Sequence, residues 1–348
     1  MLFRSVRHTL RESNRHATGR RRAPAWRGGV AACGSSDDDS GDSGSGSAGG
    51  TQDATLVLDF IPGAVHAGIY EAMQKGYYED NGINLKIIEP TSTADTLKLI
   101  DAGKAEFGIA DGIDLATQIS DGREAQGIMA LLQRPPGGLI TLKDDNITDP
   151  KQLEGKTVGI TGVPSDTAIL NTVMKDAGGN PDDANVVTIG FNGVQSLEAG
   201  KVSAFTGFIP ADGVQVEADG YPTRSFPLDE YGGPSYPGLV VFSTETKIGD
   251  DPDLMQGFVD ATIKGYQDAL ADPQEALNAL YAQTQGLDKG LQKKVFEAYV
   301  PYFGPSDTFG QFNKDNLESL STFMVDNDLA SQPISPDRYA TTEFTQPK

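Results

Sequence analysis

The sequence predicts an α/β fold with parallel-rich sheets flanked by helices. Along most of the chain, short apolar strands alternate with helical segments of about ten residues, which is typical of βαβ units. Two strongly apolar segments, 139–142 and 239–242, flank an internal α/β unit. This arrangement predicts one domain inserted into another, with the two segments as hinge strands. Domain I then comprises residues 54–142 and 239–348, and domain II comprises residues 143–238.

The first unit supports this interpretation element by element. Side chains 83–88 alternate as in a strand with one buried face, and Ala94, Leu97 and Ile100 share one face of a helix. We predict strands at 55–60, 83–88, 107–110 and 125–132, with helices at 67–75, 94–100 and 115–120 between them.

The second unit repeats the alternation, and the chain then becomes helical. We predict strands at 157–160, 185–189, 204–208 and 223–227, helices at 166–177 and 194–198, and a returning strand at 238–242. Beyond Pro252 we predict helices at 254–270, 273–284, 287–299 and 316–327.

Charge is distributed unevenly along the 348 residues. The whole chain has 28 Lys and Arg against 49 Asp and Glu, for a formal net charge of −21. Residues 1–33 nevertheless hold eight arginines and one acid, whereas residues 34–53 hold five aspartates and no basic residue. The sequence thus predicts a basic leader, a Gly/Ser/Asp tether and an acidic folded body. The only tryptophan, Trp26, and the only cysteine, Cys33, both lie in the leader.

The end of the leader favours export and lipid attachment. Residues 30–34 read Val-Ala-Ala-Cys-Gly and resemble a bacterial lipobox, which implies lipidation of Cys33 and an extracytoplasmic, membrane-anchored protein. The polar tether fits a flexible spacer. An export signal also needs an apolar stretch of about 7–15 residues, and Pro24 and Arg27 interrupt that region here. The alternative is a basic tail in which the cysteine occurs by chance.

Composition excludes several classes of protein. The sequence contains no run of about 20 apolar residues, the length that a membrane-spanning helix needs. A single cysteine excludes a disulfide framework and a Cys-based zinc cluster. The acidic balance disfavours nucleic acid as a partner. The body has no Ser/His/Asp triad that one histidine could serve, no phosphate loop and no metal-ligand spacing, so we expect no metal and no cofactor.

Segments of the body follow one another in the order and spacing of a known family. The matching segments are 58–70, 75–78, 81–83, 88–90, 103–108, 153–159, 197–201 and 213–215. They resemble the thiamine pyrimidine-precursor-binding proteins of ABC importers, over about residues 55–245. The same broad family includes sulfonate, nitrate and riboflavin binders.

The resemblance implies the two-domain periplasmic-binding-protein fold of type II, with two hinge strands. It implies an extracytoplasmic solute-binding lipoprotein that delivers a small heteroaromatic solute, a thiamine pyrimidine precursor above all, to an ABC permease and ATPase. Riboflavin, a sulfonate or nitrate remain alternative ligands. We expect a monomer that meets the membrane through its lipid anchor alone.

Four candidate ligand-binding residues follow the first strand. Asp59 and Phe60 end that strand, and ligands of parallel α/β sheets bind at the carboxyl ends of strands. His66 is the only histidine of the body, and Tyr70 could stack on a heterocycle. Helix capping and core packing are the alternative roles of these four side chains.

Further candidates stand where later helices begin. Asp111 follows the strand at 107–110 and could bind a ligand amine, whereas Asp114 is better explained as the cap of the next helix. Ser165 and Asp166 open a helix whose free amides could hold a polar ligand group, with N-capping as the alternative.

The remaining candidates rest on the family resemblance. Phe191 and Asn192 resemble its cleft segment. Phe208 and Asp212 stand where pyrimidine-precursor binders have an aromatic residue and, four residues later, a Glu that pairs with the aminopyrimidine. Asp212 is one methylene shorter than that Glu, and a surface turn is the alternative.

A second class of protein shares the resemblance, namely the pyrimidine synthase of thiamine biosynthesis. That enzyme has a cofactor-binding Lys and a sacrificial His where this chain has Ala110 and Asp114, and a Cys-rich segment where this body has no cysteine. The sequence therefore favours a binding protein over an enzyme. A tethered structural adhesin is disfavoured, because the chain has no tandem repeat.

Overall fold

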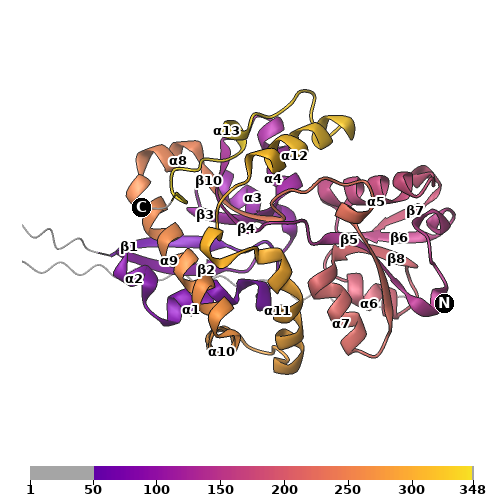
Figure 1. The fold of residues 1–348 in the computed structure, drawn as a ribbon, viewed down its shortest axis with the longest axis horizontal. Coiled ribbons are helices and arrows are strands. Elements are labelled where there is room, and N and C mark those ends of the chain that lie inside the picture. The colour runs from indigo at the N-terminus through magenta and orange to yellow at the C-terminus, as the bar shows by residue number, and fades with distance from the viewer. Residues whose placement is uncertain (1–50, 347–348) are drawn as a thin grey trace, which may run out of the picture. The chain divides into compact units, whose positions relative to one another are not determined.

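The computed structural model of the protein describes residues 51–346, which form two five-stranded sheets with helices packed on them (Figure 1). The predicted α/β fold with parallel-rich sheets flanked by helices is therefore confirmed. The leader, its Cys33 and the tether up to residue 50 lie outside the described residues. Within the described range, no helix is long and apolar enough to cross a membrane.

The first sheet combines the first four strands of the chain with its last. These strands are β1 (Gln52–Val57), β2 (Ile83–Ile88), β3 (Phe107–Asp111), β4 (Ala125–Leu132) and β10 (Leu239–Thr244). They are ordered β2-β1-β3-β10-β4. β1 pairs in parallel with β2 and β3, whereas β10 runs antiparallel to β3 and β4.

The second sheet has the same pattern but is formed by consecutive strands. These are β5 (Gly137–Leu142), β6 (Thr157–Ile160), β7 (Asn185–Thr188), β8 (Ala204–Phe208) and β9 (Thr223–Pro227). They are ordered β7-β6-β8-β5-β9. β6 is parallel to β7 and β8, and β5 is antiparallel to β8 and β9.

Helices follow the parallel strands and then dominate the C-terminal part. Those between the strands are α1 (Ala67–Gln74), α2 (Tyr77–Asp80), α3 (Thr93–Asp101), α4 (Gly112–Ser120), α5 (Pro164–Asp176), α6 (Gly193–Glu198) and α7 (Val214–Ala218). Those after β10 are α8 (Glu245–Asp250), α9 (Pro252–Ala271), α10 (Pro273–Gln283), α11 (Lys289–Phe303), α12 (Lys314–Asp326) and α13 (Pro336–Tyr339).

Both faces of each sheet are covered, as the alternation of side chains along a strand requires. On β5, Leu139 faces the core beneath α5, and its neighbour Ile140 faces the core beneath α6 and α7. On β10, Val241 faces the core beneath α1, α9 and α10, whereas Val240 faces the one beneath α4 and α12. The cores of α4 and α5 are continuous, so the two sheets share apolar packing on that side.

Close packing of α1 on α9 fixes the loop that follows β1. A Cβ atom on Gly68 would lie 2.5 Å from the ring of Tyr266, and one on Gly265 would lie 2.2 Å from the carbonyl oxygen of Gly68. The two helices therefore meet almost backbone to backbone. The hydroxyl of Tyr266 donates to the carbonyl oxygen of Val65, at 2.7 Å, and so holds the start of α1.

Two adjacent connections join the sheets, at residues 133–136 and 228–238. The amide of Gly238 donates to the carbonyl oxygen of Leu132, at 2.9 Å, and Arg134 forms an ion pair with Asp229, at 2.8 Å. The segments predicted as hinge strands belong to β5 and β10, each of which lies within one sheet directly after a connection. The division into two domains and the hinge motion stay predictions.

Some predicted boundaries are wrong. The first strand ends at Val57 instead of residue 60, because Asp59 leaves the ladder to bond with His66 in a turn. Several short helices were missed, since four to six residues span fewer than two turns and show little apolar periodicity. The elements missed in this way are α2, α7, α8 and α13.

Candidate functional site

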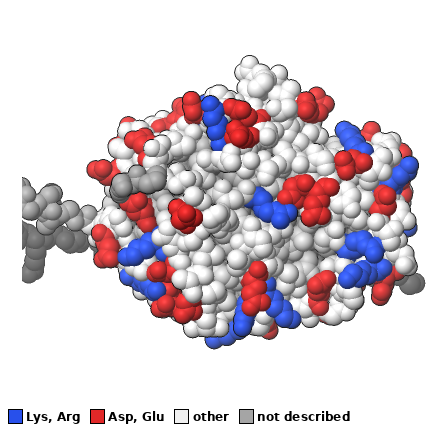
Figure 2. All heavy atoms as spheres, in the orientation of Figure 1, with Lys and Arg blue, Asp and Glu red and all other residues white. Residues whose placement is uncertain are grey.

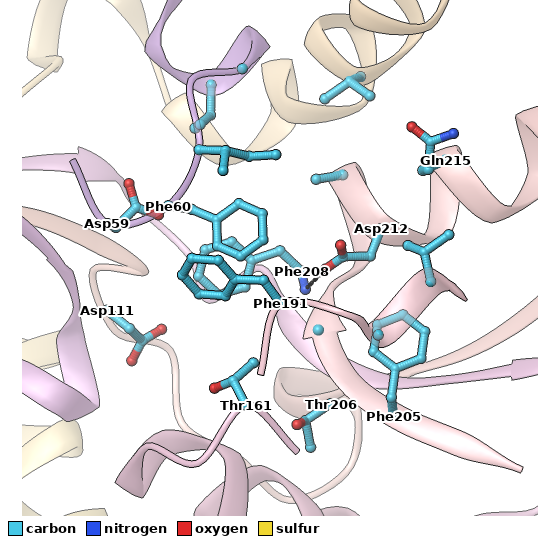
Figure 3. A pocket seen from close by; sticks show the side chains of 18 of the residues that line it. Asp59, Phe60, Asp111, Thr161, Phe191, Phe205, Thr206, Phe208, Asp212 and Gln215 are labelled. Carbon is cyan, nitrogen blue, oxygen red and sulfur yellow. Dashed lines mark hydrogen bonds between the residues drawn. The ribbon is translucent and has the colours of Figure 1, made fainter. Parts of the chain in front are cut away.

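A cavity of about 430 Å³ lies at the carboxyl ends of the parallel strands (Figure 3). Its walls come from the loops after β1, β3, β6, β7 and β8, and from one face of α11. Strand ends of both sheets thus converge on a single site, which is where open parallel sheets bind ligands.

The loop after β1 is closed by a buried pair of side chains. Nε2 of His66 lies 2.9 Å from Oδ1 of Asp59, and the amide of Gly63 donates to Nδ1 of His66, at 3.2 Å. With Nδ1 accepting from this amide, Nε2 is the ring nitrogen that faces the carboxylate. Oδ2 of Asp59 accepts no hydrogen bond from the described residues and is accessible from the cavity.

Asp111, at the end of β3, caps α4. Its Oδ1 accepts from the amide of Ile113, at 2.8 Å, and its Oδ2 accepts from the hydroxyl of Tyr236, at 3.4 Å. Burial, followed by the charge of Asp114, raises the pKa of Asp111 well above its ordinary value. Asp111 thus takes the capping role that the sequence analysis gave to Asp114.

Asp114 instead reaches from α4 to the first turn of α5. It accepts from the amide and from the hydroxyl of Ser165, at 3.0 and 2.9 Å. Burial raises the pKa of Asp114 to about 7, although these two hydrogen bonds act in the opposite direction. Asp114 therefore caps a helix of the other sheet rather than its own.

Asp166 stabilises the loop before α5 through hydrogen bonds. Its Oδ2 accepts from the hydroxyl of Thr161 and the amides of Gly162 and Val163, at 2.6, 2.9 and 3.1 Å. Its Oδ1 accepts from the hydroxyl of Thr206 on β8, at 2.6 Å. Both oxygens are thus used to hold the protein's own loop.

Aromatic rings form the middle of the cavity. The ring centroids of Phe60 and Phe191 lie 4.1 Å apart with their planes tilted by 59°, so the loops after β1 and β7 touch through these side chains. In the view of Figure 3 these rings and Phe208 lie between Asp59 and Asp212. The three rings offer apolar faces to a flat ligand.

Asp212 stands in a π-helical turn, Ile209–Gly213, directly after β8. Its Oδ2 accepts from the amide of Phe208, at 2.8 Å, whereas Oδ1 has no partner among the described residues and is reachable from the cavity. Burial raises the pKa of Asp212 to about 6, against the effect of the Phe208 hydrogen bond. A Cβ on Gly207 would lie 2.7 Å from Oδ2, so only glycine leaves room for this carboxylate.

Helix α11 supplies a wall that sequence reasoning missed. Gln292 accepts from the amide of Ala64 through Oε1, at 2.7 Å, and Val295 and Tyr299 line the cavity below it. Burial, with the charges of Asp212 and Asp59, raises the pKa of Tyr299. No local pattern marks these residues, because they follow the strand ends by more than 75 positions in the sequence.

The structure brings most of the predicted site residues to the cavity. Those that line it are Asp59, Phe60, His66, Asp111, Ser165, Asp166, Phe191, Phe208 and Asp212. Their roles in ligand binding stay predictions. The residues not foreseen include Thr161, Thr206, Gln215, Gln292 and Tyr299.

Two of the predicted residues do not line the cavity. Tyr70 lies on α1, packs in the core of the first sheet and borders a separate groove beside Met73 and Leu85. Asn192 is exposed, and its side chain turns back to donate to the carbonyl oxygen of Ile189, at 3.0 Å. Tyr70 is buried against the first sheet, a direction that its spacing from His66 did not reveal.

The polar lining is acidic. It contains Asp59, Asp111, Asp114, Asp166, Asp212 and Asp219, and no described lining residue is Lys or Arg. The surface differs, because Figure 2 shows basic and acidic side chains interspersed on one face. Across residues 51–346, no group of three or more His, Cys, Asp or Glu side chains is arranged to hold a metal ion.

Comparison with known protein sequences identifies relatives along most of the chain. A family model described as NMT1/THI5 like matches residues 64–276. The formylaminopyrimidine-binding protein of Halalkalibacterium halodurans is 26% identical over 285 residues, which cover 80% of this chain and 86% of that one. The 4-amino-5-hydroxymethyl-2-methylpyrimidine phosphate synthase of Legionella pneumophila is 28% identical over 254 residues, covering 72% and 79%.

Solved structures share the fold at low sequence identity. The alkanesulfonate-binding protein SsuA of Xanthomonas axonopodis pv. citri superposes with a TM-score of 0.69 and 13% identity, covering 84% of this chain and 99% of that one. The ligand-binding component of an ABC-type import system from Staphylococcus aureus superposes with a TM-score of 0.67 and 11% identity, covering 85% and 98%. At such identities the likeness establishes the periplasmic-binding-protein fold alone.

Proposed function

The chain belongs to the NMT1/THI5-like family, and from that premise we propose that it binds an aminopyrimidine precursor of thiamine outside the cytoplasm and delivers it to an ABC importer. The fold is that of solute-binding proteins, and a relative carries the name formylaminopyrimidine-binding protein. Import, the exact pyrimidine and attachment through Cys33 are parts of the proposal.

The observation that carries the proposal is the free carboxylate oxygen of Asp212 beside aromatic rings. An aminopyrimidine presents a ring nitrogen and an exocyclic amine along one edge, and a carboxylate can accept hydrogen bonds from such an edge. Phe60, Phe191 and Phe208 supply faces for the flat ring. A cavity of about 430 Å³ is of the size that small-molecule sites have.

The cavity does not favour the anionic ligands considered. Sulfonates and nitrate are anions, and the described lining residues include no Lys or Arg to neutralise them. A pyrimidine synthase is the second candidate function, because several relatives carry that name. Against it, Ala110 and Asp114 stand where the resemblance would require a cofactor-binding Lys and a His.

Calorimetric titration of the purified protein tests the proposal. Native mass spectrometry would first identify any small molecule carried through purification. Aminopyrimidines, riboflavin, alkanesulfonates, nitrate and pyridoxal phosphate would then be titrated separately. We expect saturable binding of aminopyrimidines alone. Binding of pyridoxal phosphate, with a pyrimidine product formed on adding iron, would replace the transport assignment by the synthase.

Lipid attachment has its own experiment. Wild type and Cys33→Ala would be expressed in the native host and separated into membrane and soluble fractions. We expect the wild type in the membrane fraction and the variant released or unprocessed. Identical fractionation and identical migration of the two proteins would refute anchoring through Cys33, without bearing on the ligand.

A further inference from the structure

Resting on the proposed function, we propose that this cavity takes the phosphate-free form of its pyrimidine and rejects the phosphate ester, with Asp114 as a specificity-determining residue. The two forms differ only in a phosphate group of charge about −1.5 to −2 at pH 7, which needs cations or free hydrogen-bond donors. The described lining residues include no Lys or Arg, and acidic side chains already occupy the donors around the start of α5.

Several backbone amides at the cavity are already used by the protein's own acceptors. The amide of Gly63 donates to His66, and that of Ala64 donates to Gln292. The amides before and within α5 are used in the same way, as is the one at the end of β8. They belong to Gly162 and Val163, which donate to Asp166, Ser165, which donates to Asp114, and Phe208, which donates to Asp212.

The serine and threonine hydroxyl groups of the lining are used similarly. Thr161 and Thr206 both donate to Asp166, and Ser165 donates to Asp114. Two carboxylate oxygens at the cavity stay free as acceptors, namely Oδ2 of Asp59 and Oδ1 of Asp212. Such a cavity matches a ligand that donates hydrogen bonds, such as an amine or a protonated ring nitrogen.

Asp114 occupies the one place where an anion would otherwise be expected to bind. The 13-residue helix α5 directs its N-terminal end at the cavity, and helix N-termini attract anions. The carboxylate of Asp114 already accepts from both Ser165 donors there, and it comes from α4 of the other sheet. A phosphate would have to displace this carboxylate or lie beside it, close to the carboxylate of Asp166.

The test compares one pyrimidine with and without its phosphate. 4-Amino-5-hydroxymethyl-2-methylpyrimidine and its monophosphate would be titrated calorimetrically into wild type, Asp114→Asn, Ser165→Ala and Asp121→Asn at pH 7.5. Asp121 is exposed at the end of α4, so its variant loses the same charge outside the cavity. Circular dichroism and melting curves would verify that each variant is folded.

We expect wild type to bind the free pyrimidine at least about 100-fold more tightly than the phosphate. Asp114→Asn should reduce this ratio by about tenfold or more, because one of the carboxylates nearest to α5 loses its charge. Asp121→Asn should keep the wild-type ratio, since the Asp114 carboxylate remains. Ser165→Ala removes a partner of that carboxylate but not its charge, so it should lower the ratio less than Asp114→Asn does. A purely structural Asp114–Ser165 pair would instead make the first two variants alike.

The outcomes separate the two proposals. Equal affinity for the pyrimidine and its phosphate, or tighter binding of the phosphate, would refute the selectivity while leaving a pyrimidine-binding protein. An unchanged ratio in a folded Asp114→Asn would remove Asp114 as its determinant. Binding of neither compound would overturn the proposed function itself.

Discussion

The carboxylate of Asp212 is held by a single backbone hydrogen bond and by the absence of a side chain on Gly207. Loss of a hydrogen bond to a charged group costs on the order of 1.5–3 kcal/mol, so Asp212→Ala should weaken pyrimidine binding roughly 10- to 150-fold. Gly207→Ala should weaken it as well, since its Cβ would push the carboxylate aside. Calorimetric titration measures both effects, with the exposed Asp182→Ala as control.

An unchanged affinity in Asp212→Ala would place the ligand elsewhere in the protein. Loss of affinity in Gly207→Ala but not in Asp212→Ala would show that the turn after β8 acts through its shape rather than through the carboxylate.

The buried pair of His66 and Asp59 should matter for stability as well as for the loop. His66→Ala would leave the carboxylate of Asp59 and the amide of Gly63 without their partners. Each buried group left unsatisfied costs about 1–3 kcal/mol. Denaturant unfolding should therefore give a lower midpoint with an unchanged slope. His66→Gln keeps one polar group and should recover part of the loss; no difference between the two variants would contradict the role of the hydrogen bonds.

At this scale the sequence located the right strand ends but not the directions of side chains. Asp59 and Asp212 could be selected because carboxyl ends of parallel strands converge. Tyr70 and Asn192 could not be rejected, because helix orientation and a local turn decide where each points. Asp111 took the capping role predicted for Asp114, because the helix begins three residues earlier than predicted.

Among the elements, α4 gives the clearest pH prediction. The pKa of Asp111 is raised in the folded chain, so the native state holds a proton that the unfolded state has lost. Stability contributed by this group is therefore full below the unfolded pKa of about 3.9 and falls as the pH rises toward the folded value. Asp111→Asn keeps a capping side chain and should be more stable than wild type at pH 8.

Melting curves at several pH values would measure this effect. Each kcal/mol that the substitution adds to the free energy of unfolding should raise Tm by roughly 2–4 °C, or less for a longer chain. The advantage of Asp111→Asn should shrink as the pH falls toward 4. A constant difference across that range, or a less stable variant at pH 8, would contradict the assignment; the exposed Asp182→Asn serves as control.

Prediction of helices and strands succeeded where the hydrophobic periodicity extends over several turns. It failed where a side-chain hydrogen bond determines the backbone conformation. The long helices α9 and α10 begin and end within two residues of their predicted positions. The π-helical turn after β8 was missed, although it positions Asp212, because its conformation depends on the carboxylate that bonds back to Phe208.

For the molecule as a whole, a ligand held by both sheets should favour a closed form. Solution scattering should give a smaller radius of gyration with a pyrimidine than without it. At the same subsaturating concentration, Asp212→Ala should compact much less. Absence of compaction with a ligand shown to bind would mean that a hinge between the sheets is not used.

The strand order of the first sheet has a consequence for the chain while it is being synthesised. All five strands of the second sheet lie within residues 137–227 and can pair as soon as that stretch is available. β4 pairs only with β10 among the strands, so it waits for residues 239–244. In a nascent chain paused before Leu239, β4 has no neighbouring strand, and its Met129, Leu131 and Leu132, which are buried in the finished fold, are exposed. This makes it the interval most prone to aggregation. A chain paused beyond Thr244 is the first in which every strand has its neighbour.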